Sequence, residues 1–138
     1  MSFITWVKGA FAAVSGLVAH LFGGFDLFLE ALLVCLVVDF VTGIMAAAYE
    51  KRLNSEKCFQ GLLKKVAILG IVAAACCVGY ILGQPAIRGV VIGFYIANEV
   101  LSTLENAARM QVPVCKRFIG ILEQLKDEMD NHDKNKEE

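Results

Sequence analysis

Two acidic side chains lie inside hydrophobic segments, where few soluble functions would place them. Asp39 lies near the middle of one apolar segment, and Glu99, preceded by Asn98, lies near the middle of another. A carboxylate at the centre of a bilayer costs about 3 kcal/mol or more on insertion scales, so it usually faces a helix bundle or water. These residues therefore indicate a polar interior or a water-filled passage.

Further polar side chains around Glu99 recur at spacings of three and four, which places them on one helical face opposite Phe94, Leu101 and Leu104. Either they form hydrogen bonds across helices within one protomer, or they line a lumen or an oligomer interface. We favour the second interpretation, because three helices enclose little volume and we expect no Lys or Arg near the middle of the spans. The candidate pore-lining or oligomer-lining residues are Asp39, Tyr95, Asn98, Glu99, Ser102, Glu105 and Asn106.

In that second interpretation, Asp39 and Glu99 hold a dry, packed assembly that becomes wet when they ionise. Small residues at every fourth position indicate where helix backbones approach closely, and this pattern favours a homo-oligomer. The expected helix-packing residues are Gly43, Ala47, Ala75, Gly79 and Gly83.

Catalytic and metal-binding patterns are missing from the sequence. An intramembrane aspartyl protease needs two positioned aspartates, and only Asp39 lies in an apolar span. There is no P-loop, HExxH or glycine-rich nucleotide motif. The five cysteines form no CxxC pair, so we interpret them as small hydrophobic side chains. We expect no enzyme activity, no catalytic residue, no metal and no cofactor.

The elements that position the polar residues are long and apolar, since 57% of the chain is hydrophobic and 20% is charged. Three segments, at about 27–49, 66–83 and 89–108, approach the ~20 residues that span a bilayer as a helix. Residues 1–24 carry Lys8, His20 and a stripe of small residues. We expect an amphipathic interfacial helix there, with a fourth span as the alternative. The sequence thus predicts an all-α integral membrane protein with three transmembrane helices in residues 25–108.

Basic residues determine the expected orientation. They cluster between the first two spans and after the third, and the positive-inside rule places both clusters in the cytoplasm. Residues 109–138 then form a short cytoplasmic amphipathic helix, with Phe118, Leu122, Leu125 and Met129 on one face, and a charged tail. A net charge of −1 gives no reason to expect a nucleic-acid partner. The topology determinants are Lys51, Arg52, Lys57, Lys64, Lys65, Arg109, Lys116 and Arg117.

Four stretches carry a family pattern: residues 39–47 (DFVTGIMAA), 55–65 (SEKCFQGLLKK), 94–108 (FYIANEVLSTLENAA) and 112–126 (VPVCKRFIGILEQLK). Together they resemble the toxin secretion/phage lysis holin family over residues 35–126, leaving the N-terminal segment uncovered. Cys115 stands where members usually have a second proline. The positions that match the family pattern are Asp39, Gly43, Gly61, Lys65, Asn98, Glu99, Glu105, Asn106 and Pro113.

The resemblance implies a protein that accumulates in the cytoplasmic membrane of a bacterial host, oligomerises, and opens lesions at a set moment. A muralytic endolysin then reaches the cell wall and the host lyses, although no direct contact between the two proteins is implied. Some relatives are implicated in toxin release instead. A small ion channel or transporter and a regulatory antiholin are the alternative functions.

Overall fold

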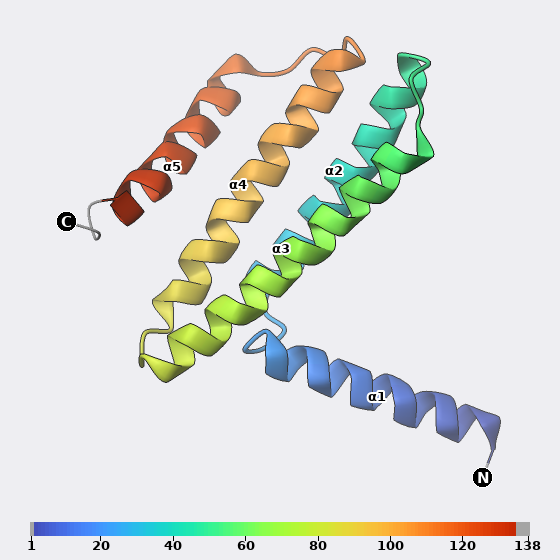
Figure 1. Cartoon of the computed structure of the whole chain (residues 1–138), viewed down its shortest axis with the longest axis vertical. Coiled ribbons are helices and arrows are strands. Elements are labelled where there is room, and N and C mark those ends of the chain that lie inside the picture. The colour runs from blue at the N-terminus through green and yellow to red at the C-terminus, as the bar shows by residue number, and fades with distance from the viewer. Residues whose placement is uncertain (1, 135–138) are drawn as a thin grey trace.

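A computed structural model describes residues 2–134, which form five helices and no strand (Figure 1). The helices are α1 (Phe3–Leu21), α2 (Leu27–Tyr49), α3 (Ser55–Ile81), α4 (Ala86–Arg109) and α5 (Lys116–Lys134). Helices α1 to α4 are each long and apolar enough to cross a bilayer. The chain is therefore an all-helical, multi-pass membrane protein, as the sequence predicts.

Helix α3 begins earlier than apolarity alone predicts. The side chain of Asn54 accepts hydrogen bonds from the backbone N–H groups of Glu56 and Lys57, at 2.8 and 3.3 Å. This N-cap starts the helix at Ser55, so most of the expected basic linker is helical. The first three turns are amphipathic, and a search for uniform apolarity misses such turns. As a result Lys65 lies ten residues inside α3 and not at its edge.

The turn between α3 and α4 depends on two glycines that the sequence marks as helix-packing residues. Gly83 has a left-handed φ of +64°, and the backbone N–H of Gln84 donates to the carbonyl of Gly79 at 2.8 Å. This is a Schellman motif. A Cβ atom on Gly79 would lie 2.9 Å from the carbonyl oxygen of Gln84. Both glycines therefore serve the tight turn between two helices of one chain.

Helices α2, α3 and α4 lie alongside one another and form the bundle (Figure 1). Its core contains Leu32 and Leu36 of α2, Val72 of α3 and Ile92 of α4. The outside of the bundle is also apolar, with exposed side chains that include Val34, Val37, Val41, Val66 and Ile71. Such an exterior is suited to lipid, and a bundle in lipid is held together by packing and polar contacts.

The two end helices are placed differently. Helix α1 runs away from the bundle, and no residue of Phe3–Leu21 is buried (Figure 1). Helix α5 turns back alongside α4, and its Leu122 is buried. The predicted C-terminal helix is therefore present, with Leu122 on its packed face. The Met129 side chain and the last four residues of the predicted tail lie outside the described residues.

Candidate functional site

Three charged side chains from three helices meet in the middle of the bundle, and we call Asp39, Lys65 and Glu99 the buried triad. Asp39 lies ten residues before the end of α2, Lys65 ten residues after the start of α3, and Glu99 ten residues before the end of α4. These three helix ends are at the same end of the bundle (Figure 1), which we call the basic end. Ten helical residues rise about 15 Å, which is half the thickness of a hydrocarbon layer.

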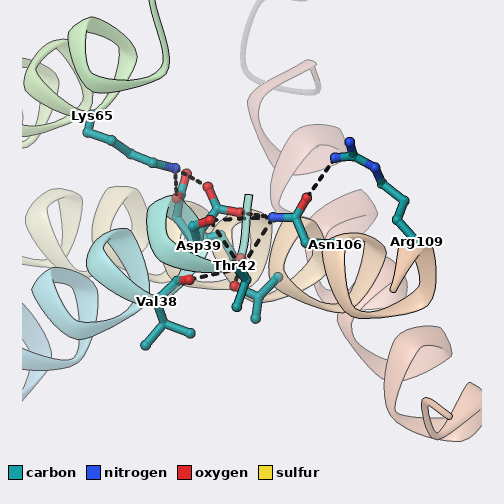
Figure 2. Close-up of polar contacts among 8 residues, drawn as sticks. Val38, Asp39, Thr42, Lys65, Asn106 and Arg109 are labelled. Carbon is teal, nitrogen blue, oxygen red and sulfur yellow. Dashed lines mark hydrogen bonds and ion pairs between the residues drawn. The ribbon is translucent and has the colours of Figure 1, made fainter. Parts of the chain in front are cut away.

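The ammonium group of Lys65 donates to the carboxylates of both Asp39 and Glu99. Figure 2 shows the Lys65 side chain reaching across to Asp39. The side chains are well shielded, with exposed fractions of 11% for Asp39, 15% for Lys65 and 4% for Glu99. Two carboxylates share one ammonium, so the fully ionised triad carries one excess negative charge.

Asn106 connects the buried triad to the end of α4. Its side-chain amide donates to the Asp39 carboxylate at 3.2 Å and lies 3.3 Å from the Thr42 hydroxyl, while its oxygen accepts from Arg109 at 3.2 Å (Figure 2). The approach of α4 to α2 is close, because a Cβ atom on Gly43 would be 3.5 Å from the Asn106 amide nitrogen. A small residue at position 43 is what leaves room for this contact.

The expectation that no basic residue reaches the two mid-span acids is wrong. It assumes that Lys65 belongs to a linker outside the span, whereas α3 begins at Ser55 and carries Lys65 to the depth of Asp39 and Glu99. The two acids do lie close together, as their positions in the sequence predict. Within one chain, the hydrogen-bonding groups of Asp39, Glu99 and Asn106 all have partners.

The remaining residues of the polar stripe on α4 have different surroundings. Asn98 and Ser102 line a cavity beside the buried triad. Tyr95 packs against the apolar core, with its ring edge-on to Phe94 at a centroid distance of 5.3 Å. Glu105 is exposed. The stripe therefore divides into an inner part that faces α2 and α3 and an outer residue, Glu105.

An ion pair joins neighbouring elements at each end of the bundle, and the sequence pattern predicts neither pair. At the basic end, Arg109 donates twice to Glu50, at 2.7 and 3.2 Å, and this contact lowers the pKa of Glu50. At the other end, Arg88 donates to both carboxylate oxygens of Asp26, at 2.8 and 3.0 Å.

Arg88 also fixes the link between α1 and α2. Its guanidinium donates to the backbone carbonyls of Phe22 and Gly24, at 2.6 and 3.2 Å. The hydrogen bonds that the Asp26 carboxylate accepts from Arg88 and from the backbone N–H of Leu29 lower its pKa to about 2. The position where α1 leaves the bundle is therefore held by one side chain of α4.

Among the described residues, no group of three His, Cys, Asp or Glu side chains is arranged to hold a metal ion. The five cysteines are free thiols, three of them half-buried and two exposed.

Comparisons with known proteins identify the family of the chain. The model of a bacteriophage holin family matches residues 16–127. An uncharacterised protein of Listeria innocua is 42% identical over 130 residues, 91% of each chain. An uncharacterised 14.9 kDa protein encoded in the nagH 3′ region of Clostridium perfringens is 32% identical, over 88% of this chain and 94% of its own. No solved structure matches the chain. The protein belongs to the bacteriophage holin family.

Proposed function

We propose that the protein acts as a phage-type holin, which oligomerises in the bacterial cytoplasmic membrane and opens lesions that release an endolysin or a toxin. One observation carries the proposal: a chain of the holin family holds a charged triad in the middle of a bundle whose exterior is mostly apolar. Charged groups at that depth are costly and are retained where they face water or a partner at some stage of function.

The contacts within one chain suggest how a protomer remains in the membrane before lysis without permeabilising it. The polar groups of the buried triad bond to one another, and the outside of the bundle is apolar. A protomer of this kind can accumulate in lipid without exposing the charges of the buried triad. For a lesion to open, the polar face of α4 must exchange its partners on α2 and α3 for water. We propose that this happens in an oligomer, where the polar face of α4 lines the lumen.

Such an exchange would be cooperative. Removing one partner from a buried ion pair costs about 3–5 kcal/mol when the remaining charge stays in a dry environment. A single protomer in lipid therefore keeps the triad closed. Several protomers that admit water together avoid this cost, because water solvates the separated charges.

The proposed topology has three spans, α2 to α4, with the C-terminus in the cytoplasm. Basic residues gather at one end of the bundle, which the positive-inside rule assigns to the cytoplasm. Helix α1 packs few of its residues on the bundle and would lie along the outer membrane surface. This topology requires α5 to leave the side of α4, where it packs in the structure, so that its charged face reaches the cytoplasmic surface. In this arrangement Arg88 and Asp26 lie at the outer surface.

Expression in bacteria, with and without a cytoplasmic endolysin, tests the function. We expect a sudden fall in culture turbidity only when both proteins are present, with folded endolysin released through the membrane. A small ion channel would collapse ion gradients without releasing the enzyme, and an antiholin would delay lysis by another holin. Either of those results would refute the proposal.

Labelling of single cysteines tests whether the polar face of α4 lines the lesion. In a chain whose five native cysteines are replaced, Ser102→Cys should react with a membrane-impermeant thiol reagent only after lysis is triggered. Leu101→Cys, the neighbouring position on the apolar side of α4, is the matched control and should stay unreactive. Equal reaction at both positions would exclude a lumen lined by the polar face.

A further inference from the structure

A cavity of about 570 Å³ lies between α2, α3 and α4 and extends from the buried triad to the α2–α3 loop. All three helices contribute to its wall, together with Arg52 and Asn54 of the loop. The function proposed above uses the buried triad and the polar face of α4 but gives the cavity no occupant, although it is large enough for part of a small molecule.

The charges around the cavity favour an anionic occupant. Five cationic and three anionic side chains line it. The three carboxylates already have cations: Lys65 bonds to two of them and Arg109 to Glu50. Within residues 2–134, Arg52, Lys57 and Lys64 have no carboxylate at ion-pair distance. Three cations are therefore free to bind an anion at the mouth of the cavity.

One side of the same cavity is apolar, while the buried triad, Asn98 and Ser102 line its inner end and the side toward α4. Phe40, Ile44 and Ala47 of α2 and Ile68 of α3 line the apolar side. An occupant that binds the free cations and also packs on this apolar side has a negative group and a hydrocarbon chain.

We propose that this cavity binds an anionic phospholipid, with the phosphate of the headgroup held by Arg52, Lys57 and Lys64. One acyl chain lies along Phe40 and Ile68. Basic pockets between membrane helices bind anionic headgroups in this way, and the apolar wall distinguishes a lipid from a free phosphate ion. The proposal requires only that the protein resides in a membrane, and it does not depend on lesion formation.

Native mass spectrometry of the full chain, released from nanodiscs that contain equal amounts of phosphatidylglycerol and phosphatidylcholine, tests the proposal. The test variant is Arg52→Gln/Lys57→Gln/Lys64→Gln. The matched control, Lys8→Gln/Lys51→Gln/Lys116→Gln, removes the same number of positive charges outside the cavity. Helix content by circular dichroism verifies that each protein is folded.

We expect the wild type and the control to retain one phosphatidylglycerol in preference to phosphatidylcholine. In the triple variant, the ratio of bound phosphatidylglycerol to bound phosphatidylcholine should fall about a hundredfold, since each cation near a headgroup contributes about fivefold in affinity. If the triple variant does not fold, Lys57→Gln alone should weaken binding about fivefold. Equal retention by the triple variant and the control would overturn the proposal. Displacement of the lipid by millimolar inorganic phosphate would assign the site to a free anion and would also overturn it.

Discussion

Replacement of Lys65 by methionine separates the contribution of the buried triad from that of packing. Methionine keeps the length and flexibility of the side chain but removes the ammonium that both carboxylates share. Asp39 and Glu99 would then face each other at mid-depth without a cation.

The structure indicates a large effect. The acid side chains are only 11% and 4% exposed, so water screens them little. Leaving a buried charge without its partner costs about 3–5 kcal/mol, a factor of about 150 to 5,000 in the folding equilibrium. Repulsion between the two carboxylates acts in the same direction, because both lie within reach of one nitrogen.

Equilibrium unfolding in mixed micelles of a mild detergent and SDS, followed by a dye pair on α2 and α4, measures this loss. Lys64→Met is the matched control. It removes the neighbouring cation, which is exposed, and should change stability by less than about 0.5 kcal/mol. Adding Asp39→Asn and Glu99→Gln to Lys65→Met should recover most of the loss, since amides can bond to each other without a cation.

Two outcomes would refute this reasoning. One is a loss for Lys65→Met no larger than that for Lys64→Met. The other is that Asp39→Asn/Lys65→Met/Glu99→Gln is no more stable than Lys65→Met alone. The same set of variants tests the link to function: if Asp39→Asn with Glu99→Gln changed neither assembly nor the timing of permeabilisation, the two acids would have no role in the switch.

Three further predictions concern the turns and the orientation of the chain. Because Arg88 lowers the pKa of Asp26 to about 2 from an ordinary 3.8, the ionised pair stabilises the fold above about pH 4 and this contribution is lost toward about pH 2. Because the Asp26 side chain is 53% exposed, the ion pair contributes less than about 1 kcal/mol to stability. Asp26→Asn should remove this contribution in thermal unfolding scans between about pH 4 and about pH 2. If the pH dependence of the unfolding temperature were the same in Asp26→Asn and the wild type, the pair with Arg88 would not be its cause. Gly79→Ala should cost about 1–3 kcal/mol of stability, because the added Cβ clashes with the carbonyl of Gln84. The control Gly70→Ala, in the same helix, meets nothing within 4 Å and should be neutral or stabilising by up to about 1 kcal/mol. Equal unfolding midpoints for the two variants would show that the turn relaxes around the added Cβ. A reporter active only in the periplasm should be inactive when fused to the C-terminus, and activity there would reverse the proposed topology.

The sequence predicts much of the architecture because the hydrophobic spans are long. The span at 27–49 coincides with α2, and the spans at 66–83 and 89–108 lie largely within α3 and α4. The approach of Asp39 to Glu99 is also predictable, since both lie at the centre of their spans. Gly43 opposite Asn106 follows the same logic, because small residues mark close helix contacts.

The place of Lys65 is harder to predict, because hydropathy treats a basic residue as the end of a span. The signal that locates it is local: Asn54 followed by Glu56 is a good start for a helix, and counting from that cap places Lys65 at mid-depth. The Arg88–Asp26 pair has no such signal. It joins residues 62 positions apart, and only the packing of α4 against the α1–α2 link determines it.

The shared ammonium of Lys65 has a consequence for the insertion of the chain into the membrane. The ribosome delivers α2 first, then α3, and α4 last. When α2 and α3 have emerged, Asp39 and Lys65 can form a neutral pair, and the two helices can then leave the translocation machinery as a hairpin without an isolated charge. Glu99 arrives with α4 and finds the ammonium in place. Biogenesis of the bundle is thus compatible with the order of synthesis, because α3 and α4 each bring a charge to mid-depth after a helix that carries a group of opposite charge.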